Sequence, residues 1–281
     1  MVGRKKNLDE WIQENQKIFS PSICMKMMYN GQLKVYCVGG PNIGKDYRIT
    51  NCDQFFYMKQ GYMDLYIMEN NLQRKITIKQ GEVFLLPARV PMSPKRYSNS
   101  IGLRAERSRI GQEMDCIRYY TKNNSAVLYE RWFNFTDPQQ FKPIQDDFYS
   151  SDAFKTGTPS KDSKLIVAPY EAEAKAIVEE PFSLDQWLER NNQGLTSGKL
   201  NLFEGDYKAH IIVYGPGEDE VVNEDADTFV WALRGTTILD VAGEATRTLG
   251  INDTDYIRKG RRYKITRGDG ARVIQVVMAH Y

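Results

Sequence analysis

An internal repeat constrains this chain more than any other feature of its sequence. Four segments recur later in the chain in the same order, the first two at an offset of 176 residues and the last two after a slip of two or three residues. Matches that keep their order over so much of a chain indicate a duplicated structural module. The matching pairs are NLDEWIQENQ (7–16) with SLDQWLERNN (183–192), KVYCVGGP (34–41) with HIIVYGPG (210–217), QFFYMKQG (54–61) with TFVWALRG (228–235), and GEVFLLPARV (81–90) with TDYIRKGRRY (254–263).

Each copy opens with a short amphipathic helix and continues as short strands. Asn7 and Ser183 are suitable N-cap residues, each followed three positions later by Glu10 or Gln186, which is the capping-box spacing. Alternating strands separated by Gly, Pro and Asn then predict an antiparallel sandwich or barrel in each copy. A proline-rich stretch separates them, and its end, 168–180, is either a short helix or a linker. We therefore expect modules at 1–136 and 181–281, joined by a connection at 137–180.

The first copy also carries a two-part motif. Gln54 precedes Gly61 by seven positions, Gly81 precedes Pro87 by six, and Met92 follows. The cupin barrels share this pattern as Glu-(x)6-Gly and Gly-(x)5-Pro followed by a metal-binding His. The resemblance implies an all-β fold of tandem cupin (bicupin) jelly-roll barrels with a few short helices, the second of them metal-free.

Four further segments carry a narrower resemblance: GGPNIGKDYRI (39–49), GEVFLLPARVPMSPKR (81–96), RYY with LYERWF (118–133), and EPFSLDQWL (180–188). By these segments the chain resembles, within the cupins, the animal-type, two-cupin 3-hydroxyanthranilate 3,4-dioxygenases. That family holds a non-heme Fe(II) with two His and one Glu. By this resemblance the three ligand positions fall on Arg48, Gln54 and Met92, so all three ligands are replaced.

The same resemblance implies a partly kept substrate pocket. Two Arg and one Glu bind the substrate in the family; the first Arg position is Gly44 here, whereas Arg96 and Glu106 match the other two. One interpretation is that Arg96 and Glu106 now pair with each other, or with Arg48, in a buried ionic network. The other is that they still bind a ligand.

Arg48 suggests a specific hypothesis. A buried carboxylate without a compensating cation is costly. We therefore expect the Arg48 guanidinium to occupy the position of the metal and to bond to Glu106, with Gln54 and Met92 as neutral filler.

From the ligand positions alone, we expect a catalytically inactive pseudoenzyme without a cofactor, retained for protein binding, scaffolding or regulation. Two alternatives stay open. One is an active enzyme of the 3-hydroxyanthranilate type with a displaced metal site. The other is a non-catalytic sensor of an aromatic carboxylate.

Charge and hydropathy indicate which classes of partner and which cellular compartment to expect. The chain has 38 Lys and Arg against 36 Asp and Glu, which gives no general reason to expect nucleic-acid binding. The basic segment from Arg258 to Arg267 is an exception, and it predicts either a nucleic-acid or phosphate patch or a solvated hairpin attracted to the acidic stretch at 218–227. We expect an unidentified protein partner, no membrane, and a cytoplasmic location with a nuclear one as the alternative, since no apolar run spans a bilayer and no signal core is seen.

Overall fold

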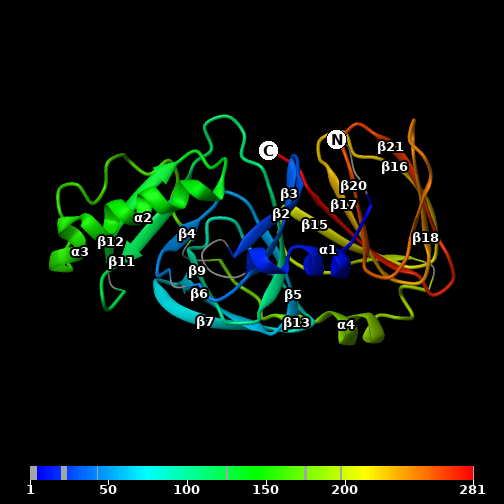
Figure 1. Ribbon diagram of the computed structural model, residues 1–281, viewed down its shortest axis with the longest axis horizontal. Helices are drawn as coiled ribbons and strands as arrows, with labels where there is room; N and C mark the ends of the chain where they lie inside the picture. The colour runs from blue at the N-terminus through cyan, green and yellow to red at the C-terminus, as the bar shows by residue number, and fades with distance from the viewer. Residues whose placement is uncertain are drawn as a thin grey trace.

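The computed structural model describes residues 5–19, 24–42, 44–124, 126–173, 176–196 and 198–280. Its strands form four antiparallel sheets that make two barrels, one from each copy of the repeat (Figure 1). The predicted all-β tandem-barrel fold is therefore confirmed.

The first barrel consists of two six-stranded sheets. In the first, the order is β13 (Phe182–Ser183), β8 (Glu82–Leu86), β5 (Gln54–Gln60), β10 (Ile101–Arg107), β3 (Leu33–Gly39) and β2 (Met25–Asn30). In the other, it is β12 (Val127–Phe133), β11 (Asp115–Tyr120), β4 (Tyr47–Ile49), β9 (Met92–Arg96), β6 (Tyr62–Glu69) and β7 (Leu72–Lys79).

The second barrel repeats the topology of the first. Its six-stranded sheet runs β1 (Lys6–Asn7), β20 (Asp253–Ile257), β17 (Thr228–Arg234), β22 (Arg272–Met278), β15 (Ala209–Tyr214) and β14 (Lys199–Asn201). Its four-stranded sheet runs β16 (Gly217–Val222), β21 (Arg262–Arg267), β18 (Thr237–Val241) and β19 (Arg247–Leu249). The segments matched in the sequence repeat form equivalent strands, and β5 and β17 both end at a glycine with a φ of +69°, at positions 61 and 235.

The two copies exchange their first strands. Strand β1 precedes the first barrel in sequence but pairs with β20 of the second, as Lys6 lies opposite Thr254. Strand β13 precedes the second barrel but pairs with β8 of the first, as Phe182 lies opposite Val83. Each barrel thus receives an edge strand from the segment that leads into the other.

The sheet of the first barrel that contains β8 packs against the six-stranded sheet of the second barrel, and residues on both of its faces are buried. Alternation along β8 shows this: Val83 and Leu85 face the core shared by the two barrels, whereas Phe84 and Leu86 face the interior of the first barrel. An apolar cluster fills the second barrel, with Val230, Leu239 and Val273 among its members. The hydrophobic effect therefore stabilises both the barrels and their contact.

Short helices accompany the barrels. Helices α1 (Leu8–Glu14) and α4 (Leu184–Arg190) begin where the repeat predicts, because the side chains of Asn7 and Ser183 accept hydrogen bonds from backbone N–H groups of the first turn. Three more helical segments, η1 (Gln16–Phe19), η2 (Pro138–Gln140) and α3 (Asp152–Thr156), are a turn or so long, and α2 (Phe141–Ser150) is longer. No described helix is long and apolar enough to cross a membrane.

The connection between the modules is partly helical. Helices α2 and α3 lie on the side of the first barrel away from the second (Figure 1). The described part of 168–180 is not helical, which favours the linker interpretation for that stretch. It lies along the first barrel, where the Glu173 N–H donates to the Arg89 carbonyl and the Val178 N–H to the Glu69 carboxylate.

Candidate active site in the first barrel

A small cavity in the first barrel brings the candidate residues together. Its volume is about 10 Å³, which is room for about one water molecule. Strands β4, β9, β10, β11 and β12, together with the start of α2, supply its walls. The lining residues are Arg48, Thr50, Met92, Arg104, Glu106, Asp115, Cys116, Phe133, Phe135 and Phe141.

Two of the three positions matched to metal ligands line this cavity. Arg48 on β4 and Met92 on β9 are partners across the ladder, so their side chains lie side by side. Gln54, at the start of β5, is not part of the lining. Its amide nitrogen donates to the Thr50 hydroxyl at 2.8 Å, and its amide oxygen is buried with no hydrogen-bond partner among the described residues.

These three side chains do not fit an iron ion. Arg48 carries a permanent positive charge and has no lone pair to donate. Gln54 offers a neutral oxygen, and the thioether of Met92 is a soft ligand suited to Cu(I). Among the described residues there is also no group of three or more His, Cys, Asp or Glu side chains arranged to hold a metal ion.

Arg48 does not contact Glu106, so the charge-replacement hypothesis is wrong in its geometry. Its Nε donates to Asp46 Oδ2 at 3.2 Å, and its guanidinium carbon lies 3.9 Å from the centre of the Phe141 ring. Asp46 also accepts a 3.0 Å hydrogen bond from Gln145 on α2. The Asp46 carboxylate therefore fastens both Arg48 and helix α2 to the barrel rim.

Gly44 lies beside this carboxylate. A Cβ atom at position 44 would come within 2.6 Å of Asp46 Oδ1. Because Oδ1 accepts the hydrogen bond from Gln145, a larger residue at 44 requires the Asp46 carboxylate to shift and disturbs this contact. The glycine at position 44 therefore leaves room for the Asp46 carboxylate to contact both Arg48 and Gln145.

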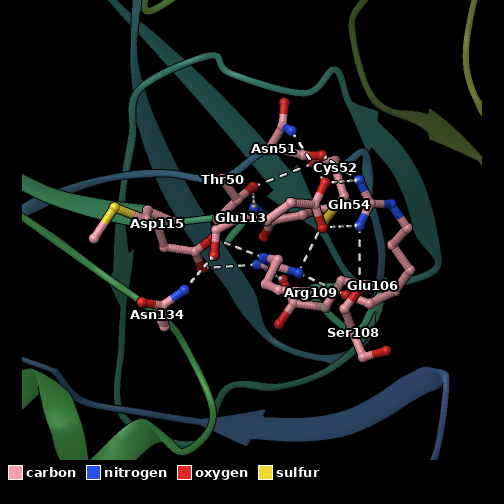
Figure 2. A network of polar contacts seen from close by, with 12 residues as sticks. Thr50, Asn51, Cys52, Gln54, Glu106, Ser108, Arg109, Glu113, Asp115 and Asn134 are labelled. Carbon is pink, nitrogen blue, oxygen red and sulfur yellow. Dashed lines mark hydrogen bonds and ion pairs between the residues drawn. The ribbon is translucent and has the colours of Figure 1, made fainter. Parts of the chain in front are cut away.

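Glu106 is neutralised by two other arginines. Arg104 Nη2 donates to Glu106 Oε1 at 3.2 Å, and Arg109 Nη2 donates to Glu106 Oε2 at 3.3 Å. Arg109 also holds Asp115 in a two-pronged contact at 2.6 and 2.8 Å and reaches the Cys52 thiol, as the dashed lines in Figure 2 show. Burial alone raises the pKa of Glu106, but Arg104 and Arg109 outweigh it and hold the pKa below its usual value.

Arg96 pairs with neither Glu106 nor Arg48, so the ionic pairings expected for it are wrong as well. Its Nε donates to the Gly39 carbonyl at 2.7 Å. Burial, together with the nearby charges of Arg48 and Arg104, lowers the pKa of Arg96 to about 10. The guanidinium groups of Arg48, Arg96 and Arg104 therefore lie near one another, and the carboxylates of Asp46 and Glu106 pair with the first and the last of them.

Sequence reasoning missed several residues of the site. Arg104 stands two positions before Glu106 on β10, so both face the cavity, and this i, i+2 spacing of two charged residues in a strand was a usable signal. Arg109 and Asp115 meet only because the chain turns back after β10. Phe133, Phe135 and Phe141 form an aromatic wall, with the last two rings stacked at 5.4 Å.

The basic segment of the second barrel lies elsewhere and is matched by acidic side chains. Strand β21 pairs with the acidic strand β16, so Arg262 meets Glu220 at 2.8 Å and Lys264 meets Glu218 at 2.8 Å. Arg267 donates to Asp219, and Arg258 to the buried Asp227. The two stretches of opposite charge thus lie on two paired strands and neutralise each other.

Comparisons with known proteins identify relatives along the whole chain. A sequence model of the 3-hydroxyanthranilic acid dioxygenase family matches residues 1–149. The chain is 38% identical to the 3-hydroxyanthranilate 3,4-dioxygenase of Homo sapiens over 98% of its own length and 96% of the human chain. It is 38% identical to that of Xenopus laevis over 94% of each chain, and 37% identical to that of Caenorhabditis elegans over 82% of each.

Solved structures agree on the fold. A cupin 2 conserved barrel domain protein from Leptotrichia buccalis is similar over 100% of this chain and 98% of its own, with a TM-score of 0.51 and 10% identity. A point mutant of the salicylate 1,2-dioxygenase from Pseudoaminobacter salicylatoxidans is similar over 98% of this chain and 83% of its own, with a TM-score of 0.57 and 9% identity. At such identities the likeness supports the cupin fold alone.

These findings correct the function expected from the sequence. The expectations of a catalytically inactive pseudoenzyme, of a protein kept for binding or scaffolding, and of a chain without a cofactor are wrong, because the matching relatives from vertebrates to a nematode are named as dioxygenases. The error came from judging activity by three side chains, when the identity runs through both barrels. This chain belongs to the 3-hydroxyanthranilic acid dioxygenase family.

Proposed function

We propose that this chain is an enzyme that opens the ring of an aminohydroxybenzoate of the 3-hydroxyanthranilate type with dioxygen. The observation that carries the proposal is the 38% identity over 98% of the chain to a relative of that name. Such a level of identity over both modules is hard to reconcile with kinship of the fold alone. A dioxygenase reaction inserts both oxygen atoms of O₂ and breaks one carbon–carbon bond of the ring.

The chemistry of the cavity supports an aromatic acid as substrate. Phe133, Phe135 and Phe141 offer flat apolar faces to a ring. Arg104 on the opposite side offers a cation to a carboxylate, and Glu106 accepts hydrogen bonds from an amine or a hydroxyl group. Binding of this kind orients the substrate and, with the aromatic wall, excludes water from its reacting edge.

Ring opening of this type depends on a cofactor that activates dioxygen. Arg48, Gln54 and Met92 do not fit iron, so no step is assigned to a cofactor at these positions. The contributions that we assign to the described residues are binding and orientation of the substrate, and the fixed charge of Glu106 close to it.

The decisive experiment is a turnover assay combined with metal analysis. Purified protein is incubated with 3-hydroxyanthranilate and air after reconstitution, separately, with Fe(II), Mn(II), Cu(I) or no metal. We expect substrate loss, equimolar O₂ uptake and a ring-opened product with at least one of these metals, and elemental analysis reports the amount bound. The Glu106→Gln variant is expected to lose most of this activity.

A reference variant makes a negative result informative. The triple substitution Arg48→His, Gln54→Glu and Met92→His places two imidazoles and a carboxylate, the donor set that Fe(II) oxygenases use, in the first barrel. Turnover by the triple variant, with none by the parent chain under any metal condition, refutes the proposed function. Turnover by the parent chain supports it.

We also infer a cytosolic location for this activity. The four cysteines at positions 24, 37, 52 and 116 are buried free thiols. Free thiols are typical of reducing compartments. Fractionation with an antibody to the chain tests this inference.

A further inference from the structure

Two buried donors on neighbouring strands lack acceptors. Arg104 and Tyr36 are partners across the β10–β3 ladder, so their side chains lie on the same face of the sheet. Nε of Arg104 and the hydroxyl group of Tyr36 are both buried, and neither has a hydrogen-bond partner among the residues that the structure describes. The guanidinium carbon of Arg104 lies 4.8 Å from the centre of the Tyr36 ring, so the two groups are adjacent.

Leaving such donors unpaired is unfavourable. The side chain of Arg104 is 8% exposed, and its described ion pair goes to Glu106 alone. Glu106 in turn shares its charge between Arg104 and Arg109. A buried donor without an acceptor costs free energy, more so when it belongs to a charged group. The arrangement therefore gains from an anion that accepts from these donors.

The charges around the cavity also favour binding of an anion. Four guanidinium groups, of Arg48, Arg96, Arg104 and Arg109, lie in or near it. Three carboxylates, those of Asp46, Glu106 and Asp115, are close enough to pair with them. Among these seven groups one positive charge is in excess, and Arg104 is the one of the four arginines whose buried Nε lacks an acceptor among the described residues.

We propose that Arg104, assisted by the Tyr36 hydroxyl, binds the carboxylate of the aromatic substrate. The inference rests on the proposed function and names the residues that select the substrate. In the family an arginine at the position of Gly44 contacts the substrate. We assign this role here to Arg104, which extends from β10. The planar guanidinium offers two parallel N–H groups, the geometry that a carboxylate accepts.

The site has to open for the ligand to enter. A cavity that binds benzene measures on the order of 150 Å³, whereas this one measures about 10 Å³. The wall formed by Phe141 belongs to α2, which the Gln145–Asp46 hydrogen bond and the Arg48–Phe141 contact hold in place. Displacement of the start of α2 therefore creates the required space next to Arg104 without breaking a β ladder.

Paired ligands measure the carboxylate contact directly. 3-Hydroxyanthranilate and 2-aminophenol share the ring, the amine and the hydroxyl, and differ in the carboxylate. Isothermal titration calorimetry under nitrogen gives the dissociation constant of each for the parent chain and for Arg104→Met, Arg104→Lys and Tyr36→Phe. Arg267→Met is the matched control, because it removes a guanidinium that is 4% exposed in the second barrel.

The parent chain is expected to prefer 3-hydroxyanthranilate by roughly 10- to 100-fold, the usual effect of hydrogen bonds to a charged group. Arg104→Met is expected to abolish this preference, Arg104→Lys to restore part of it, Tyr36→Phe to reduce it a few-fold, and Arg267→Met to leave it intact. Circular dichroism and a urea titration verify that each variant is folded; if Arg104→Met is not, Arg104→Lys and Tyr36→Phe decide in its place.

Two outcomes overturn the inference: a parent chain that binds neither ligand or does not discriminate between them, and folded Arg104 and Tyr36 variants that keep the full preference. Because the readout is binding, it is independent of turnover. A preference that disappears in Arg104→Met, in a chain without ring-opening activity, supports the inference and refutes the proposed function.

Discussion

The two barrels share a topology but differ in what they bury. Arg104 on β10 lies opposite Phe56, and Gln275 on β22 lies opposite Val230, which is the counterpart of Phe56 in the repeat. The same interior position thus carries a cation in the first barrel and a neutral amide in the second. Around Gln275 the interior of the second barrel is mainly apolar, whereas Arg104 borders a cavity with charged walls.

The difference teaches which features belong to the fold and which to the site. The interior of the second barrel is mainly apolar, and its buried Asp255 carboxylate pairs with Arg247 away from the described cavity. The cluster of charges around the cavity of the first barrel is therefore not required by the topology. Buried ion pairs are in general weak evidence for stability, since desolvation offsets their attraction. Buried charges occur in both barrels, but those of the first barrel line the described cavity, which indicates a role in binding or chemistry.

The largest loss of stability in the comparison of the two barrels is expected for Arg109→Met. Arg109 is 5% exposed and is shared by Glu106 and Asp115, so its loss leaves two buried carboxylates short of a cation. Breaking a buried pair from one side typically costs about 3–5 kcal/mol. Urea denaturation measures the free energy of unfolding. Arg267→Met in the second barrel is the control, expected to cost about 1 kcal/mol because its partner Asp219 is 33% exposed. Equal losses in the two variants would contradict the contrast between the barrels.

The pH dependence of the free energy of unfolding, measured for the parent chain and for Glu106→Gln, tests whether the buried charge of the first barrel is stabilising. Burial raises the pKa of Glu106, but Arg104 and Arg109 lower it further than burial raises it, so the net shift is below the ordinary value of 4.5. A carboxyl group with a lowered pKa in the folded state stabilises the protein above the unfolded pKa and loses this contribution as pH falls through the folded pKa. The parent chain is therefore expected to exceed the variant in stability by about 1–3 kcal/mol at pH 7. The gap should narrow as pH falls below 4.5. A gap that stays constant down to about pH 2 would show that the Glu106 charge does not stabilise the barrel.

Arg48→Ala is expected to cost less, about 1–2 kcal/mol. Arg48 has one described carboxylate partner, Asp46, and its side chain is 17% exposed, so water reaches it. Asp46 keeps the hydrogen bond from Gln145 after the substitution. Urea denaturation beside Arg109→Met ranks the two residues. A loss for Arg48→Ala as large as that for Arg109→Met would reinstate Arg48 as the main internal cation.

Gln145→Leu tests the closed wall of the first barrel, which has no equivalent described in the second. Removal of the hydrogen bond to Asp46 weakens the attachment of α2, so association of 3-hydroxyanthranilate is expected to become a few-fold faster. Stopped-flow fluorescence under nitrogen measures the rate. Lys142→Leu, on the same helix but paired with the exposed Asp146, is the control and should leave the rate unchanged. Unchanged association in Gln145→Leu would mean that the ligand enters by another route.

The smallest effect is expected from Gln275→Leu. Its amide nitrogen is buried with no partner among the described residues, and its oxygen accepts from Tyr263 at 3.1 Å. One unpaired donor disappears and one hydrogen bond is lost, so the net change should stay within about 1 kcal/mol. Thermal and urea denaturation measure it. A large loss would show that the second barrel also depends on a polar interior.

Much of the fold follows from the sequence because it rests on local signals. Asn7 and Ser183 cap their helices as the repeat predicts, and the strands matched across the repeat are equivalent. Of the six candidate residues, Arg48, Met92 and Glu106 line the cavity. Arg48 and Met92 meet because adjacent strands of the barrel bring the two halves of the motif together. The ion pairs were not predictable. Whether Arg48 meets Glu106 or Asp46 depends on side-chain direction at the rim, which no periodicity encodes.

The exchange of β1 and β13 between the barrels has a consequence for how the chain came to be one polypeptide. In a protein with a single copy of the module, the same edge can be completed only by the leading strand of a second copy, which is the geometry of a strand-swapped dimer. Fusion of two copies places both leading strands at a fixed high effective concentration, so the pairing no longer depends on protein concentration. Neither module cut at residue 136 or 180 contains a complete sheet edge: the fragment 1–136 lacks Phe182 and Ser183, and the fragment 181–281 lacks Lys6 and Asn7. Mixed together, the two fragments carry every strand of both barrels, and their reassembly reports how much of the fold depends on covalent linkage.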